Sequence, residues 1–262
     1  MNSQVLKNSG QNQFYGFLRY CIFLIAIWSI IPAVQAQTHS AVTPAPRESD
    51  YWLARFNDIN AQIKQGHVDL LFVGDSITHW WQGRVSRDGE SIDGGKAIWA
   101  EYYSKRNAAN IGIAGDRTEH VLWRLQNGNI DGISPKVAVL MIGTNNSRTN
   151  TAEEIADGIV AVVSELRSRL PTTKVLLLAI FPRGEKPDER REMLATASKL
   201  AAARVVDGEA VHYLDINSHF LTQEGILSAE IMPDFLHPSE KGYQIWASAM
   251  EPKIQTLMME NH

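Results

Sequence analysis

The sequence predicts a single α/β domain in three layers, with a parallel β-sheet covered by helices on both faces. Short apolar runs rich in β-branched residues alternate five times with longer stretches whose apolar residues recur at helical spacing. The third run, 137–142, is apolar throughout, which is typical of parallel strands buried on both faces. There is no internal repeat, so the pattern predicts one domain with right-handed crossovers.

Residues 1–36 differ from the rest of the chain and predict a secretory signal. Lys7 and Arg19 are the only charged residues there, and the apolar segment 21–34 is followed by a small-residue pattern ending in Val-Gln-Ala. We expect cleavage after this pattern and a secreted or periplasmic protein. The alternative is an uncleaved membrane anchor. The apolar segment is short for a membrane span and contains Pro32, which favours the signal.

Cysteine content and charge exclude several classes of protein. The only cysteine, Cys21, lies inside the apolar segment, so the mature chain would have no disulfide, thiolate nucleophile or cysteine metal site. The formal net charge is −4, and no cluster of Lys and Arg suggests a nucleic-acid surface. We therefore expect no nucleic-acid partner, and no stable membrane anchor once the signal is removed.

The elements of the domain follow in chain order. Residues 37–50 are polar, contain two prolines and predict a linker, which leaves 51–262 for the domain. The stretch 82–96 is rich in Gly, Ser and Asp and predicts an exposed loop. We expect strands at 68–73, 108–113, 137–142, 174–180 and 211–214, and helices at 51–64, 97–105, 118–126, 151–170, 188–206 and 239–258.

Polar motifs directly follow the first three predicted strands. Ser76 ends a Gly-Asp-Ser turn, Gly115 follows the second strand, and Asn145 lies in Gly-Thr-Asn-Asn after the third. Each has an ordinary structural alternative: a helix cap at Ser76, a weak phosphate loop at 112–115, and a simple turn at Asn145. Because the carboxyl ends of parallel strands share one edge of a sheet, their repetition predicts a single site in a crevice there.

The residue types at this edge suit ester hydrolysis. Ser76 supplies a hydroxyl nucleophile, and His237, ahead of the last helix, supplies a base. Asp234 lies three residues before His237, so a turn would let it orient the imidazole. The backbone N–H groups of Ser76 and Gly115, with the side-chain amide of Asn145, would form an oxyanion hole.

Other candidates have weaker support. His79 is close to Ser76 and would line the pocket, but no carboxylate stands in the right place to orient it. His120 and His212 fall within a predicted helix and strand and are expected to be structural. Trp80 and Trp81 either form a pocket wall or pack in the core. No His, Asp or Glu group has metal-ligand spacing, so we expect no metal.

These motifs resemble the four sequence blocks of the GDSL, or SGNH, hydrolases, and more specifically the catalytic α-subunits of intracellular platelet-activating-factor acetylhydrolase. The resemblance extends over about 68–258. It implies a flavodoxin-like fold with a five-stranded parallel sheet, a serine esterase without metal or organic cofactor, and it allows a homodimer. The motifs that carry it are Gly-Asp-Ser at 74–76, Gly-Asp-Arg-Thr at 115–118, His-Val-Leu-Trp-Arg-Leu at 120–125, Asn-Gly at 127–128, Gly-Thr-Asn-Asn at 143–146, Arg-Gly-Glu-Lys-Pro at 183–187 and Asp-Phe-Leu-His at 234–237.

The resemblance implies Ser76 as nucleophile, His237 as base and Asp234 as its orienting group, with Gly115 and Asn145 in the oxyanion hole.

The resemblance also bears on the acyl group. Small apolar residues restrict it in the acetylhydrolase subunits, and Ile77 and Leu236 match those positions, which implies acetyl esters. We expect Asp75, Trp80 and Arg183 beside the same substrate pocket.

Two features depart from those subunits: the secretion signal, and the loop at 82–96, which looks longer. They favour removal of O-acetyl groups from carbohydrates over a phospholipid substrate. Trp80, Trp81 and Trp99 would then stack on sugar rings, although core packing explains them equally well.

Several alternatives stay open at this point. They are a lysophospholipase or thioesterase, a phospholipid acetylhydrolase of the platelet-activating-factor type, and a carbohydrate-binding protein without catalysis. The α/β-hydrolase fold is a rival scaffold. Its G-x-S-x-G elbow needs a glycine where this chain has Thr78.

Overall fold

The predicted strands form one five-stranded parallel sheet in the computed structural model, which describes residues 38–85 and 91–259. The order across the sheet is β4-β1-β5-β6-β7, and every neighbouring pair is parallel. The expected α/β fold class is confirmed. The strands are β1 (Leu70–Gly74), β4 (Ala108–Asn110), β5 (Val137–Met141), β6 (Lys174–Leu178) and β7 (Val211–Leu214).

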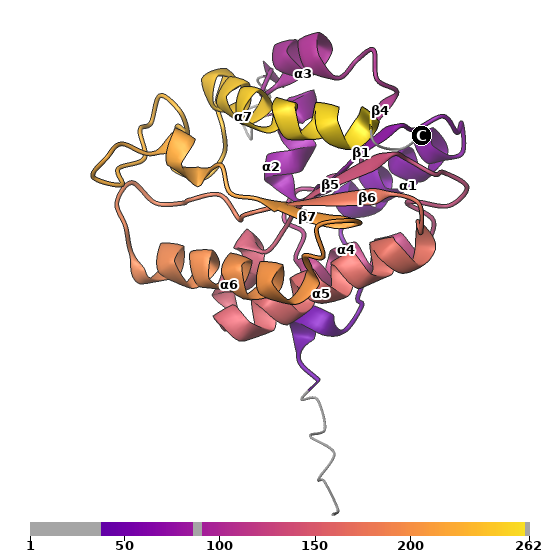
Figure 1. The fold of residues 1–262 in the computed structure, drawn as a ribbon, viewed down its shortest axis with the longest axis horizontal. Coiled ribbons are helices and arrows are strands. Elements are labelled where there is room, and N and C mark those ends of the chain that lie inside the picture. The colour runs from indigo at the N-terminus through magenta and orange to yellow at the C-terminus, as the bar shows by residue number, and fades with distance from the viewer. Residues whose placement is uncertain (1–37, 86–90, 260–262) are drawn as a thin grey trace, which may run out of the picture. The chain divides into compact units, whose positions relative to one another are not determined.

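Helices cover both faces of this sheet (Figure 1). One face packs against α1, α4, α5 and α6, and the other against α2, α3 and α7. The helices are α1 (Asp50–Ile63), α2 (Ser76–His79), α3 (Lys96–Tyr102), α4 (Thr118–Gln126), α5 (Ala152–Arg169), α6 (Glu189–Val205) and α7 (Glu240–Met259), with short 3₁₀ turns η1 (Ser40–Val42), η2 (Trp80–Gln82), η3 (Thr144–Arg148) and η4 (Asn217–Phe220).

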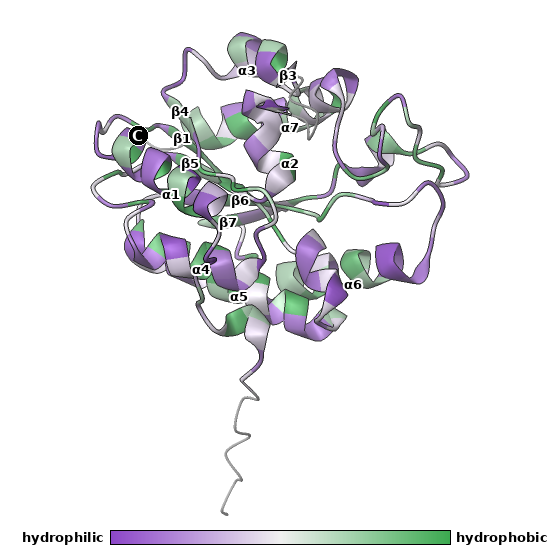
Figure 2. Ribbon diagram, turned by 180° about the vertical axis from the view of Figure 1, so that it is seen from behind, coloured by the Kyte–Doolittle hydropathy of each residue, from purple (hydrophilic) through white to green (hydrophobic). Residues whose placement is uncertain are grey.

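Alternation along the strands builds the two cores. In β1, Leu71 and Val73 enter the core with α1, α4, α5 and α6, while Leu70 and Phe72 enter the opposite core. Every residue of β1 and of β5 is buried, as the continuous apolar runs predict. Figure 2 shows hydrophobic residues on the central strands, while the helices carry both hydrophobic and hydrophilic positions.

The N-terminal segment corrects the sequence analysis. Residues 38–49, expected to belong to a linker over 37–50, are part of the same compact unit as the sheet. Ala41 is fully buried, and its carbonyl accepts a hydrogen bond from the Thr118 hydroxyl at 2.7 Å. The Ala45 N–H donates to the Glu119 carbonyl at 3.2 Å. Backbone groups and one small side chain make these contacts, so a polar, proline-rich composition does not reveal them.

The region expected as an exposed loop over 82–96 contains two short strands. β2 (Arg84–Val85) and β3 (Ser91–Ile92) pair antiparallel, and residues 86–90 between them lie outside the described part of the chain. The predicted signal, 1–36, also lies outside the described residues. Within 38–85 and 91–259, no helix is both long enough and apolar enough to cross a membrane.

Candidate active site

Ser76 stands at the carboxyl end of the central strand β1, where a tight turn leads into α2. Asp75 caps the helix, and its carboxylate accepts the Ile77 N–H at 3.0 Å. A side chain at Gly74 would collide with the Thr78 hydroxyl and the Met141 carbonyl, so only glycine fits before this turn. The turn thus places the serine at the edge of the sheet predicted for the site.

The structure brings Ser76, His237 and Asp234 together in a continuous chain of hydrogen bonds. The Ser76 Oγ lies 2.9 Å from His237 Nε2, and His237 Nδ1 lies 2.6 Å from Asp234 Oδ2. The other carboxylate oxygen, Oδ1, accepts the backbone N–H of His237 at 2.8 Å and of Leu236 at 3.2 Å. The three-residue spacing therefore folds into a turn that aims the carboxylate at the imidazole.

Hydrogen bonding keeps Asp234 ionised. Burial by itself raises the pKa of this carboxyl, but the hydrogen bonds and charge of His237, with the Leu236 N–H, outweigh it and lower the pKa to about 2. Asp234 therefore carries a negative charge at neutral pH and stabilises a proton on His237 Nδ1.

Two contacts fix the His237 loop against the serine turn. The Tyr243 hydroxyl, from α7, donates to the Ile77 carbonyl of α2 at 2.7 Å. The Gly184 N–H donates to the Phe235 carbonyl at 2.8 Å and ties the loop after β6 to the same place. The helix that follows His237 is thereby anchored to the helix that starts at Ser76.

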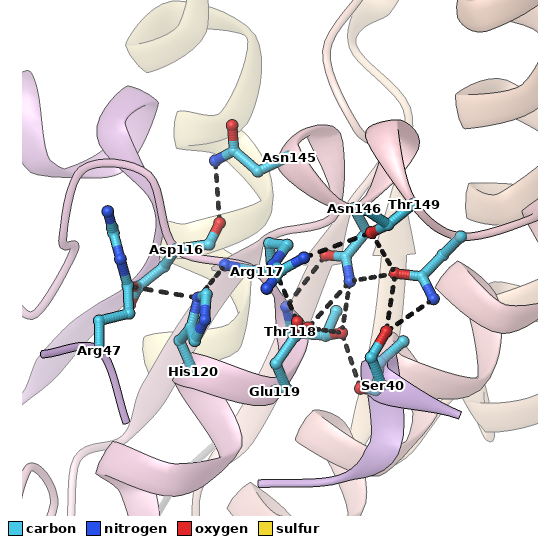
Figure 3. A network of polar contacts seen from close by, with 12 residues as sticks. Ser40, Arg47, Asp116, Arg117, Thr118, Glu119, His120, Asn145, Asn146 and Thr149 are labelled. Atoms are coloured by element: carbon cyan, nitrogen blue, oxygen red, sulfur yellow. Dashed lines mark hydrogen bonds and ion pairs between the residues drawn. The ribbon is translucent and has the colours of Figure 1, made fainter. Parts of the chain in front are cut away.

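Gly115 and Asn145 follow the two strands on either side of β1. Gly115 occupies a left-handed turn with φ of +83°, closed by the Asp116 N–H donating to the Ile113 carbonyl at 3.2 Å. The Asn145 side-chain amide donates to the Asp116 carbonyl at 2.9 Å (Figure 3). This bond uses one amide hydrogen and orients the group, which leaves its second hydrogen for another acceptor.

A buried ion pair connects these loops from beneath. Arg124 and Asp116 are both fully buried, with Nε and Oδ2 2.7 Å apart. Arg124 also donates to the Gly74 carbonyl at 2.9 Å and to Asn129 Oδ1 at 3.2 Å, and the Trp52 indole N–H donates to Asp116 Oδ1 at 2.7 Å. The pair therefore joins the end of β1, the loop after β4 and helix α1.

A second buried network holds the loop after β5 (Figure 3). Asn146 Oδ1 accepts the Thr118 N–H at 3.0 Å. Its amide nitrogen lies within 3.2 Å of Thr118 Oγ1, Glu119 Oε2 and Asn150 Oδ1. Asn146 thus anchors its neighbour Asn145 to the start of α4.

Sequence reasoning did not identify Asp116, Arg124 or Asn146 as parts of the site. One signal exists for Arg124: it lies three residues after Val121 and directly before Leu125, on the buried face of an amphipathic helix. A charged residue there needs a buried partner. Nothing in the sequence says that Asp116 supplies it.

Two of the expected pocket residues require correction. Asp75 and Ile77 have exposed fractions of 0% and 1%, so neither presents a surface to a substrate. The reason is that α2 starts immediately after β1 and packs its first turn into the core. Leu236 is partly buried, and Arg183 is half-buried with Nη1 3.3 Å from the Thr144 hydroxyl, next to Asn145.

The tryptophans divide between site and core. Trp80 packs against the catalytic candidate His237, with ring centroids 3.9 Å apart. Trp81 is fully buried, and Trp99 packs against the same core. Of the three, only Trp80 stands beside the candidate site.

His79 is a half-buried structural residue rather than a base. Its Nδ1 accepts the Ala114 N–H at 3.3 Å, next to Gly115. Burial, followed by the charges of Arg55 and Arg124, lowers the pKa of His79 to about 3, so the ring is neutral. Among the residues that the structure describes, no three His, Cys, Asp or Glu side chains gather as they would around a metal ion.

Comparison with known proteins yields a family and several relatives. Residues 72–245 match the GDSL-like lipase/acylhydrolase family. The platelet-activating factor acetylhydrolase IB subunit alpha2 of Rattus norvegicus is 36% identical over 230 residues, covering 86% of this chain and 95% of the relative. A solved structure from Streptococcus pneumoniae is similar with a TM-score of 0.59 at 21% identity, covering 77% of this chain and 94% of that one. A carbohydrate acetylesterase from Sinorhizobium meliloti has a TM-score of 0.54 at 19% identity, covering 73% and 100%.

We expect Arg124→Met to lower the free energy of unfolding by about 3–5 kcal/mol, because it leaves the Asp116 carboxylate buried without its cation. Urea unfolding followed by tryptophan fluorescence measures this change. Arg204→Met removes the exposed ion pair with Asp157 and serves as the matched control, with an expected loss of at most about 1 kcal/mol. Equal losses in the two variants would contradict the role of the buried pair.

Asp75→Asn should change how stability depends on pH. Burial, with a smaller contribution from Asp116, raises the pKa of Asp75 from 3.8 to about 7, so the folded protein keeps a proton that the unfolded chain releases. The free energy of unfolding should therefore fall from about pH 4 to pH 7, by roughly 4 kcal/mol relative to the asparagine variant.

Urea titrations at four pH values test this expectation. Asp215→Asn removes an exposed carboxylate and controls for the change in net charge. Parallel stability curves for the wild type and Asp75→Asn would show that Asp75 does not hold a proton on folding.

Proposed function

Because the chain belongs to the GDSL-like lipase/acylhydrolase family and is a serine esterase, we propose that it removes acetyl groups from carbohydrates through an acyl-enzyme on Ser76. The observation that carries the mechanism is the chain of hydrogen bonds from Ser76 Oγ through His237 to Asp234, at 2.9 and 2.6 Å. This is the arrangement of a nucleophile, a base and a group that orients the base.

The proposed reaction begins with attack of Ser76 Oγ on the ester carbonyl carbon, while His237 Nε2 takes the hydroxyl proton. Asp234 stabilises the imidazolium that results. The oxyanion accepts hydrogen bonds from the N–H groups of Ser76 and Gly115 and from the free amide hydrogen of Asn145. His237 then gives its proton to the departing alcohol.

Water completes the reaction. It attacks the acetyl-enzyme while His237 takes one of its protons, and acetate leaves as the proton returns to Ser76 Oγ. Because the same imidazole serves both halves, its hydrogen bond to Asp234 must persist throughout.

Two observations support a short acyl group and a polar alcohol. The curated relatives are named as acetylhydrolases. The recess beside Gly115 and Asn145 is lined by charged and polar side chains, which suit a hydroxyl-rich alcohol better than an alkyl chain. Since Ile77 is buried, the restriction on acyl length would come from Leu236 rather than from both residues.

Hydrolysis of nitrophenyl esters from acetyl to decanoyl tests the acyl preference. We expect a steep preference for acetyl, and Ser76→Ala should lower kcat by roughly 10⁴-fold or more, because it removes the nucleophile. Ser218→Ala, at an exposed serine, is the matched control. A preference for long chains would favour a lipase-like enzyme, and full activity of Ser76→Ala would overturn the mechanism. Acetate release from acetylated xylo-oligosaccharides then tests the carbohydrate substrate.

We also propose that the enzyme is exported, on the strength of the signal-like composition of residues 1–36. Cleavage after Ala36 would leave intact the packed domain, whose described part begins at Thr38. Expression of the full chain in a bacterial host, followed by N-terminal sequencing of the mature protein, should yield Gln37 as the first residue. A protein that keeps its first 36 residues in the cytoplasm would contradict export.

A further inference from the structure

A cationic recess of about 570 Å³ borders the proposed oxyanion hole. Gly115 and Asn145 belong to its lining, so an ester whose carbonyl oxygen lies between these two residues would have the recess beside it. Besides these two residues, its lining consists of Arg47, Glu48, Arg117, His120, Arg148 and Thr149. Three of the lining residues carry a positive charge and one a negative charge.

Arg47 reaches the recess from the N-terminal segment that packs on the domain. Its Nη1 donates to the Ala114 carbonyl at 2.8 Å and lies 2.6 Å from where a Cβ would be at Gly115. Any side chain at 115 would displace the guanidinium, so glycine permits this close approach. The arginine is therefore held over the oxyanion loop by a contact that spans 67 positions of the chain.

The other two arginines differ in their pairing. Arg117 forms an ion pair with the buried Glu119 at 2.8 Å and donates to the Thr149 hydroxyl at 3.3 Å (Figure 3). Arg148 ends the turn η3, is exposed, and has no hydrogen-bond or ion-pair partner within the described residues. Its guanidinium is thus available to a ligand, and Arg47 has donors beyond the one that it gives to Ala114.

His120 adds a neutral donor to the recess. Its Nδ1 accepts the Arg117 N–H at 3.0 Å, which places its proton on Nε2. Burial, then the charges of Arg117 and Arg47, lower the pKa of His120 to about 3. The ring therefore stays neutral beside the arginines, mainly because it is buried and to a smaller extent because of their charge.

We propose that this recess binds an anionic oxygen group, a carboxylate or a phosphate, carried by the alcohol part of the ester substrate. The proposal rests on the esterase function above and specifies its substrate class: acetyl esters of polar alcohols that carry an acidic group, in preference to neutral ones. Guanidinium groups pair with both anions through two parallel N–H···O bonds. Arg148 supplies a guanidinium group without a partner, and Arg47 and Arg117 add positive charge beside the oxyanion hole.

Binding without turnover tests this inference directly. Isothermal titration calorimetry of the full mature enzyme would compare trigalacturonate with the neutral galactotriose, which has no ester bond to cleave, and glycerol 3-phosphate with glycerol. We expect at least one anion to bind about tenfold or more tighter than its neutral counterpart, a difference of about 1.4 kcal/mol. The preference should shrink as salt rises from about 0.05 to 0.5 M, because the recess is open to solvent.

Arg148→Gln should reduce the affinity for the anion about tenfold and leave that for the neutral compound nearly the same. Arg148→Glu should abolish the preference, since the two positive and two negative charges that then line the recess cancel. Arg169→Gln controls for the change in net charge: it removes an arginine at the C-terminal end of α5, near the amino end of β6 and therefore away from the carboxyl ends of the strands. It should leave the preference unchanged.

The results distinguish a carboxylate from a phosphate ligand. They also distinguish a failure of the anionic recess from a failure of the esterase mechanism. Tight binding of trigalacturonate alone would identify a carboxylated sugar, and tight binding of glycerol 3-phosphate alone a phosphate. Equal affinity for charged and neutral compounds, or a preference unaffected by Arg148→Gln, would overturn the anionic recess even if the enzyme cleaves nitrophenyl acetate. If the wild-type enzyme bound the anion but did not cleave nitrophenyl acetate, the esterase mechanism would be refuted and the anionic recess would stand.

Discussion

The buried pair of Arg124 and Asp116 is the constraint on which the site geometry depends. Desolvating two charges is costly, and the cost is offset only when nearly all of their hydrogen-bonding capacity is used. Here the partners that satisfy it are Gly74, Asn129 and Trp52, which belong to three different segments. Meeting the electrostatic demand of one arginine therefore requires the turn before Ser76 and the turn containing Gly115 to stand side by side.

The candidate catalytic residues are held in place by further hydrogen bonds. The Tyr243 hydroxyl sets α7, and hence His237, relative to α2, while Asn146 sets the position of Asn145. Each link is a hydrogen bond in a buried place, where an unmet donor would be costly. Donors that are fixed before the substrate arrives need little reorganisation in the transition state, which is how an oxyanion hole lowers a barrier.

Charge is distributed unevenly over this protein. The chain as a whole is acidic, with a formal net charge of −4, yet arginines line the recess beside the oxyanion loop. A local cluster of positive charges creates a positive electrostatic potential at the recess without making the whole surface cationic. Arg47 lines the recess only because the N-terminal segment packs on the domain, so that segment contributes to the charge of the recess as well as to the fold.

The local sequence pattern was sufficient to predict much of this architecture. The fold class follows from apolar runs whose period and length differ between strands and helices, and the convergence of Ser76, Gly115 and Asn145 follows from the shared edge of parallel strands. The Asp234–His237 contact could also be predicted from the sequence, because residues three positions apart meet within one turn.

Contacts between distant segments were decided only by the tertiary structure. Packing of residues 38–49, the pairing of Arg124 with Asp116, and the burial of Asp75 and Ile77 all depend on which faces meet across the sheet. Arg47 lies 67 positions from the carbonyl that holds it, and no periodicity or spacing relates the two. Periodicity reports how each segment divides between core and solvent, but the partner of a buried polar group is selected by the three-dimensional arrangement of all segments together.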